Sequence, residues 1–385
     1  MLFTLAATLL LAQDRSGLIA FVGSKAGQID LFTVRPDGTD LRQITNDPLE
    51  EMQPVWSPNG RRIAYLTAVR PGQAEEAGTY LNVVDADGTN RIRLAGKRIH
   101  TFQRVAWSPD GTRLAYVETP IGARARIMLV SSTGSTPTPL RPAKPDEEMP
   151  YWGVDGRIYF TAHSTSQPAP GIYQTEVVGI VSMNPDGSGE RVVLPRVAGT
   201  PRISPDGNKL LYWSLGKLGT AKMDGTGVRE VGRTSGTVAQ WTPDGSHIVY
   251  LDESFALTVV TPDGTPQPIE ATRMARAATL SPDGKKAAFV KAITGGEAPY
   301  GLFLVDLASG VPQQVPLSVS PVVSPVGGSQ LHLHWSPTAE ASAPSSPTPT
   351  SPTNPTGTTQ AAPGLGSGFP GTPVGPDRDP SPFGT

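Results

Sequence analysis

The stretch "VAWSPDGTRLAY" at residues 105–116 recurs along this chain with small changes. Close copies are "PVWSPNGRRIAY" at 54–65, "VAQWTPDGSHIVY" at 238–250 and "ATLSPDGKKAAF" at 278–289. In these copies proline presets φ at the second position of a turn, aspartate or asparagine favours the third, and glycine accepts the positive φ from which the next strand begins. Because apolar residues flank the turn on both sides, the stretch predicts a hairpin of two antiparallel strands.

This aromatic-turn element occurs seven times, if a degenerate last copy is included. Its copies occupy residues 56–60, 107–111, 152–156, 203–207, 241–245, 280–284 and 335–339. A second series of turns, from "RPDGTD" at 35–40 to "LASGVP" at 307–312, also has seven members. Four-stranded units of about 40–50 residues are typical of β-propeller blades. The sequence therefore predicts an all-β fold, a seven-bladed β-propeller of four-stranded antiparallel blades.

The two ends of the repeat region are offset in a way that predicts how the ring closes. The N-terminal part supplies strands two, three and four of a blade, at 18–22, 29–34 and 41–45, but no first strand. The C-terminal part supplies a lone first strand, "LHLHWS" at 331–336. If these strands share one blade, the ring has no exposed sheet edge. We therefore expect the N- and C-terminal strands to complete one blade together.

The segments at the two ends of the chain differ in composition from the repeat region between them. Residues 2–12 form an apolar run followed by Gln13, Asp14 and Arg15, which suits a secretory signal better than a membrane span. A buried first strand is the alternative interpretation of this run. Residues 338–385 are dominated by Pro, Ser, Thr and Gly and bury too little apolar surface to fold. We expect a signal peptide at 1–12, the propeller at 17–337 and a disordered tail at 338–385.

Overall composition excludes several classes of function. The formal net charge is −2 and no basic run is present, so nothing favours binding to nucleic acid or to an anionic membrane surface. The chain has no cysteine, which excludes disulfides, thiolate catalysis and thiolate metal sites. We expect no cofactor, no membrane-spanning segment and a monomeric protein.

Two repeated residue types could be read as functional or as structural. Five of the six tryptophans, at 56, 107, 152, 241 and 335, hold the same position in their units. A tryptophan stripe can bind carbohydrate, but a place in the innermost strand favours a core role, with blade packed on blade. The turn aspartates could suggest calcium, yet each has a turn role, and "DADG" at 85–88 lacks the terminal glutamate of an EF-hand loop. We interpret both sets as structural.

The pattern "WSPDGxxIAY…DADGT…LT" resembles the WD-like repeats of the TolB-type propeller, the periplasmic component of the Tol–Pal envelope system. The resemblance covers residues 17–337 and implies a propeller in an exported protein. That family carries an α/β domain before a six-bladed ring. Because no such domain fits between Ala12 and Leu18, we expect this chain to lack it and to have seven blades.

Enzymes built on similar repeats supply the competing hypotheses. Prolyl oligopeptidase-like peptidases need a Gly-x-Ser-x-Gly nucleophile elbow, which is absent from this sequence. Oligogalacturonate lyases are another similar propeller class and hold a metal mainly with histidines. His332 and His334 share one face of the predicted innermost strand, and His100 precedes another such strand, so these three are weak metal candidates. Surface or packing roles for these histidines are the alternative.

The loops that enter the innermost strands carry segregated charges. We expect them to converge on one face and to form a charged channel mouth, although loop charges can also serve only to solvate the rim. The residues assigned to this mouth are Glu50, Glu51, Arg104, Glu147, Glu148, Arg202, Arg273 and Arg276. The sequence thus predicts an exported, non-catalytic scaffold that binds an envelope protein, a peptide or a cell-wall glycan. The alternatives are a metal-dependent polysaccharide lyase and an accessory subunit of a peptidase.

Overall fold

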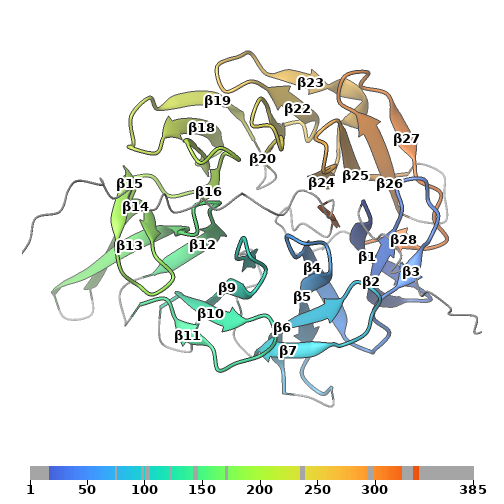
Figure 1. The fold of residues 1–385 in the computed structure, drawn as a ribbon, viewed down its shortest axis with the longest axis horizontal. Coiled ribbons are helices and arrows are strands. Elements are labelled where there is room, and N and C mark those ends of the chain that lie inside the picture. Colours follow the sequence, from blue (N-terminus) through green and yellow to red (C-terminus); the bar gives the residue numbers. More distant parts are fainter. Residues whose placement is uncertain are drawn as a thin grey trace, which may run out of the picture. The chain divides into compact units, whose positions relative to one another are not determined.

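The computed structural model describes residues 17–337, apart from 74–75, 97–98, 100–104, 121–123, 142–145, 170–171, 235–238, 294–298 and 323–332. The predicted signal peptide and the predicted tail therefore lie outside the described residues. Seven antiparallel sheets follow one another in chain order around a common centre (Figure 1). The predicted seven-bladed propeller is confirmed.

Each of blades 2 to 7 has four strands in sequence order from the centre of the ring to its rim. Blade 2 contains β4 (Glu50–Trp56), β5 (Arg62–Val69), β6 (Gly78–Asp85) and β7 (Ile92–Ala95). Blade 3 contains β8 (Ala106–Trp107), β9 (Arg113–Glu118), β10 (Arg126–Ser131) and β11 (Thr138–Pro139). Blade 4 contains β12 (Glu147–Trp152), β13 (Ile158–Ala169), β14 (Ile172–Met183) and β15 (Arg191–Pro195).

The remaining three complete blades have the same order. Blade 5 contains β16 (Thr200–Ile203), β17 (Lys209–Ser214), β18 (Lys217–Lys222) and β19 (Arg229–Arg233). Blade 6 contains β20 (Ala239–Trp241), β21 (Ile248–Leu251), β22 (Leu257–Val260) and β23 (Gln267–Ile269), followed by a short 3₁₀ helix η1 (Glu270–Thr272). Blade 7 contains β24 (Ala277–Leu280), β25 (Lys286–Ala292), β26 (Tyr300–Asp306) and β27 (Pro312–Gln314).

Blade 1 is assembled from both ends of the repeat region. It contains β1 (Ile19–Lys25), β2 (Gln28–Val34), β3 (Arg42–Gln43), β28 (Ser320–Pro321) and β29 (Leu333–Trp335). Strand β29 pairs with β1 in antiparallel register, with Ile19 opposite Trp335 and Phe21 opposite Leu333. Strand β28 pairs further along the same edge of β1, at Gly23 and Ser24. The predicted closure of the ring by one shared blade is confirmed.

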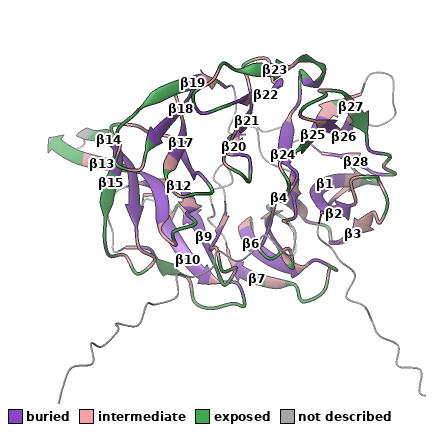
Figure 2. Ribbon diagram, turned by 45° about the horizontal axis from the view of Figure 1, so that its top comes forward, coloured by how far each residue is buried: buried purple, intermediate pink, exposed green. Residues whose placement is uncertain are grey.

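The central strands of the blades are buried on both faces because each blade is covered by its two neighbours. In β5, for example, Ile63, Ala64, Tyr65 and Leu66 are all fully buried. Figure 2 shows the same gradient, with buried residues in the inner strands and exposed residues along the rim. Continuous apolar runs of β-branched and aromatic residues are what such doubly covered strands require. No helix of the described residues has the length and apolar character needed to cross a membrane.

The repeated tryptophans are buried and join neighbouring blades, which confirms their core role. The indole N–H of Trp107 donates to the carbonyl oxygen of Val55 at 3.0 Å, and that of Trp241 donates to the carbonyl oxygen of Arg202 at 3.3 Å. In both cases the acceptor belongs to the preceding blade. Trp152 and Trp335 instead donate within their own blades, to Gly156 and Gly17.

The repeated aspartates hold the turns together. The Oδ1 atom of Asp110 accepts hydrogen bonds from the hydroxyl of Ser108 at 2.5 Å and from the backbone N–H of Thr112 at 3.0 Å. Gly111, the next residue, has a φ of 68°, a conformation that favours glycine. These contacts explain why the same residues recur in the turns, and they need no bound ion. Within the described ranges no three His, Asp or Glu side chains form a metal-binding group.

Candidate functional site

Seven side chains, one from the inner strand of each blade, line a single cavity in the centre of the ring. They occupy the position directly before the repeated tryptophan or its substitute, and the cavity has a volume of about 390 Å³. We call these residues the channel ring: Val55, Ala106, Tyr151, Arg202, Gln240, Thr279 and His334. Neighbouring residues of a strand point to opposite faces, so a buried tryptophan places its predecessor toward the channel.

The chemistry of the channel ring changes around its circumference. Blades 2 and 3 contribute the small apolar residues Val55 and Ala106, whereas the other five blades all contribute polar side chains. Arg202 was expected at the mouth and His334 at a possible metal site, whereas the ring as a whole was not expected from the sequence. The signal was present in the sequence, as the position before the tryptophan in the aligned repeats.

Arg202 carries the formal charge of the channel ring. Its side chain is buried, with 8% of the residue exposed. Nη1 donates to the carbonyl oxygen of Pro201 at 2.7 Å, and the guanidinium lies over the ring of Tyr151, 5.1 Å from its centroid. Burial lowers the pKa of Arg202 and raises the pKa of Tyr151. Arg202 forms no ion pair with any carboxylate of the described residues.

The neighbouring polar members of the ring are anchored by backbone contacts. The Nδ1 atom of His334 accepts the backbone N–H of Trp56 at 3.1 Å, so the neutral imidazole carries its proton on Nε2. The hydroxyl oxygen of Thr279 accepts the backbone N–H of Trp335 at 3.3 Å. The amide nitrogen of Gln240 donates to the carbonyl oxygen of Ala278 at 3.4 Å. These contacts fix the side chains around the cavity.

Two pairs of adjacent glutamates were expected at the mouth, Glu50–Glu51 and Glu147–Glu148. In each pair one residue is half-exposed and the other is buried. Glu51 and Glu147 lie five residues before Trp56 and Trp152, and each is 2% exposed. Each also lies two residues before a residue with positive φ, Gln53 at 54° and Met149 at 55°. A bulge follows in both strands. Glu51 and Glu147 thus hold the same position in two blades and do not lie on an exposed surface.

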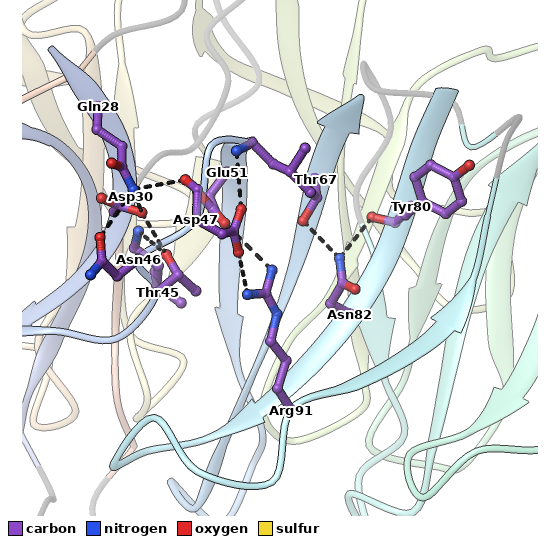
Figure 3. Close-up of polar contacts among 12 residues, drawn as sticks. Gln28, Asp30, Thr45, Asn46, Asp47, Glu51, Thr67, Tyr80, Asn82 and Arg91 are labelled. Carbon is purple, nitrogen blue, oxygen red and sulfur yellow. Dashed lines mark hydrogen bonds and ion pairs between the residues drawn. The ribbon is translucent and has the colours of Figure 1, made fainter. Parts of the chain in front are cut away.

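Glu51 lies in a polar cluster between blades 1 and 2 (Figure 3). Neither of its carboxylate oxygens has a hydrogen-bond partner, and Nη2 of Arg91 is 3.7 Å away. The same arginine pairs more closely with Asp47, and Asp30 lies nearby. Burial, together with the charges of Asp47 and Asp30, raises the pKa of Glu51 to about 9. Glu51 is therefore protonated at neutral pH.

Glu147 has the partners that Glu51 lacks. One carboxylate oxygen accepts the backbone N–H of Ile127 at 3.1 Å, and the other pairs with the buried guanidinium of Arg141. Arg141 also contacts Glu190 at 2.8 Å and lies over the ring of Phe160. Burial raises the pKa of Glu147, while these contacts oppose the rise. The pair Glu147–Arg141 joins blade 3 to blade 4.

Four of the remaining mouth residues lie where a partner could reach them. Glu50 and Glu148 are half-exposed at the starts of β4 and β12, and Glu50 pairs with Arg70 at 2.5 Å. Arg273 is exposed and pairs with Glu270, and the half-buried Arg276 lies 5.3 Å from the ring centroid of Phe255. We call these four residues the mouth set: Glu50, Glu148, Arg273 and Arg276. Arg104, His100 and His332 lie outside the described residues.

A larger hollow, of about 790 Å³, lies between blades 6 and 7, away from the channel. Its walls include η1, the end of β23 and the turn between β26 and β27. Its charged lining residues, Glu270, Lys285 and Asp306, are all exposed or half-exposed. The channel ring, with its buried cation, is therefore the stronger candidate for a binding site.

Comparisons with known proteins agree with this fold. Residues 16–268 match the family model described as the TolB beta propeller domain. The uncharacterised protein Atu1656 of Agrobacterium fabrum is 30% identical over 104 residues, which cover 26% of this chain and 35% of that protein. This chain thus matches only about a third of the length of that curated relative.

Two solved structures are among those similar to this chain. An oligogalacturonate lyase in complex with manganese is 16% identical, with a TM-score of 0.55, and the match covers 76% of this chain and 86% of that one. TolB from Acinetobacter baumannii is 16% identical, with a TM-score of 0.49, and the match covers 84% of this chain and 67% of that one. At these identities the likeness is one of fold.

Proposed function

The chain belongs to the TolB β-propeller family, and on this basis we propose that it is an exported, non-catalytic scaffold that binds an envelope protein, a peptide or a cell-wall glycan at its channel mouth. The observation that carries the proposal is the mouth set. Its four charged residues lie at the ends of inner strands, or just before them, and all these strands run in the same direction from the mouth.

The charges of the mouth set are separated by blade. The acidic members belong to blades 2 and 4, whereas Arg273 and Arg276 precede the inner strand of blade 7. A surface with acidic and basic sectors selects partners whose charges alternate in the same way, and it orients them before contact. Export is supported by the apolar run at residues 2–12 and by membership of the family.

A cross-linking capture experiment in the cell envelope tests this function. We would compare the wild type with the double variant Glu50→Gln and Glu148→Gln, which leaves the buried Glu51 and Glu147 intact. The matched control is Glu230→Gln with Asp263→Asn, two exposed acidic residues of blades 5 and 6. We expect a partner captured by the wild type and the control to be lost or strongly reduced in the mouth variant. Equal capture by all three proteins would contradict binding at the mouth.

A metal-dependent polysaccharide lyase is the second candidate function, favoured by the position of His334 in the channel. Nδ1 of His334 accepts the backbone N–H of Trp56 and the proton of the neutral ring is on Nε2, so metal binding by this residue would require that hydrogen bond to break. Elemental analysis of the purified protein distinguishes the two functions. The scaffold predicts transition metal far below one equivalent, and one equivalent that disappears in His334→Ala would support the lyase.

A further inference from the structure

Arg202 is a buried cation with no acidic partner among the residues that the structure describes. Removing a guanidinium from water is costly unless a counter-charge and hydrogen bonds replace the lost hydration. The structure supplies one backbone carbonyl and one aromatic face, from Pro201 and Tyr151. No carboxylate of the described residues lies within 4.0 Å of it, and the pKa of Arg202 is affected by no acidic residue.

Several segments of the chain lie outside the described residues. Those that lead into inner strands are 97–98, 100–104, 142–145, 235–238 and 323–332, and none of them contains Asp or Glu. An anion from outside the chain would supply the counter-charge that the described residues do not provide.

Neutral polar side chains line the same cavity as the guanidinium. Gln240 contributes an amide, and Tyr151 and Thr279 contribute hydroxyl groups. Opposite this polar arc, Val55 and Ala106 offer an apolar wall. A cavity of about 390 Å³ lies in the lower part of the range known for small-molecule sites, about 300–1,000 Å³.

We propose that the channel ring binds a small organic monocarboxylate, with its carboxylate on Arg202 and its apolar part against Val55 and Ala106. The planar guanidinium presents two parallel N–H donors that match a carboxylate. A phosphate monoester carries nearly two negative charges, and the ring holds a single full positive charge with which to balance them. The ring therefore suits a monoanion better than a dianion.

This site is distinct from the channel mouth. Glu50 and Val55 lie near opposite ends of β4, about 15 Å apart at the rise of a β-strand. The inference goes beyond the proposed scaffold function and does not depend on it. Binding at the ring should accordingly be unaffected by the mouth variant Glu50→Gln with Glu148→Gln.

The test measures ligand-dependent thermal shifts and binding heats at constant ionic strength. The probes are propionate and phenylacetate, their uncharged amides, and inorganic phosphate. The proteins are the wild type, Arg202→Gln and the control Arg93→Gln, which removes another arginine that lies over an aromatic ring. We expect at least one carboxylate to stabilise the wild type and the control with a stoichiometry of one, and to bind Arg202→Gln at least about tenfold more weakly.

Three results would overturn the proposal. The first is that neither carboxylate stabilises the wild type at 50 millimolar, about five times a weak dissociation constant of ~10 mM. The second is a thermal shift in Arg202→Gln equal to that of the wild type. The third is a response of the wild type to phosphate alone. If Arg202→Gln does not fold, phenylglyoxal modification of the wild type replaces it. In that case phenylacetate, but not its amide, should slow the modification of Arg202, and equal rates would overturn the proposal.

Discussion

Trp56 donates two hydrogen bonds to His334, a residue 278 positions further along the chain. Its backbone N–H donates to the imidazole Nδ1 and its indole N–H to the carbonyl oxygen, both at 3.1 Å. Strand β29 is thereby held on two sides, by pairing with β1 and by bonding to β4 of the next blade. The last strand of the ring contributes to two blade contacts at once.

Removing the imidazole should weaken this closure. We expect His334→Ala to lower the free energy of unfolding by about 1–2 kcal/mol, because a buried N–H of Trp56 loses its acceptor. In His334→Asn the amide oxygen can take the place of Nδ1, so most of the stability should be retained. Urea unfolding of both variants measures the difference, and equal losses would show that the acceptor is unimportant.

The indole of Trp107 combines packing with a hydrogen bond to the preceding blade, and two variants separate these contributions. Trp107→Phe keeps most of the apolar volume but loses the donor to Val55, which should cost about 1–2 kcal/mol. Trp107→Ala also leaves a cavity and should cost about 3–5 kcal/mol in total. If both variants lost the same amount in chemical unfolding, the hydrogen bond would account for the whole effect.

Glu51 should make the protein less stable as the pH rises. Its pKa is about 9 in the folded protein and near 4.5 when unperturbed, so between these values the folded state holds a proton that the unfolded chain has released. The stability that protonated Glu51 contributes is therefore fully present below about pH 4.5 and is lost progressively up to about pH 9, by at most about 1.4 kcal/mol per pH unit. Glu51→Gln cannot ionise, and its stability, measured by urea unfolding from pH 5 to 9, should fall much less.

Glu147→Gln is the matched control, because it changes the same position of another blade. Here the carboxylate is paired with the buried Arg141, so its loss leaves a guanidinium with a weaker partner. We expect Glu147→Gln to destabilise the protein at neutral pH, by about 2 kcal/mol or more, whereas Glu51→Gln stabilises it. The same sign for both variants would contradict the two environments described above.

The turn aspartates should make the protein sensitive to acid. Hydrogen bonds from Thr242 and Ser246 lower the pKa of Asp244 to about 2. The stability that this carboxylate contributes is present above its ordinary pKa of 3.8 and is lost as the pH falls toward 2. Asp244→Asn should lower stability at pH 7 by up to about 1 kcal/mol and should show a smaller further loss at pH 2–4. An unchanged acid-unfolding midpoint would argue against this role.

The blade count was predictable because a turn is encoded by residues that are adjacent in sequence. "SPDG" and its variants fix φ locally, so counting them located the hairpins and the shared blade. The length of the hairpin of β13 and β14 was not predictable, since residues 163–167 are all polar and lack the alternation that is typical of a strand.

The burial of Glu51 could not be predicted by counting alternate residues back from Trp56. A bulge between Met52 and Val55 shifts the register, and it depends on the positive φ of Gln53. The channel ring was missed for a different reason. Its seven members are chemically unlike one another, and only their common place beside the tryptophans relates them.

The pairing that completes blade 1 also sets the order in which the protein can fold. Trp335 donates to the carbonyl oxygen of Gly17, 318 residues away, whereas the other six blades are each built from one continuous segment. Contacts at such separations pay the largest loop-closure entropy and form late. During synthesis, which starts at the N-terminus, one edge of β1 therefore stays unpaired until nearly all of the propeller has been made. In that interval the edge must be kept from pairing with strands of other chains.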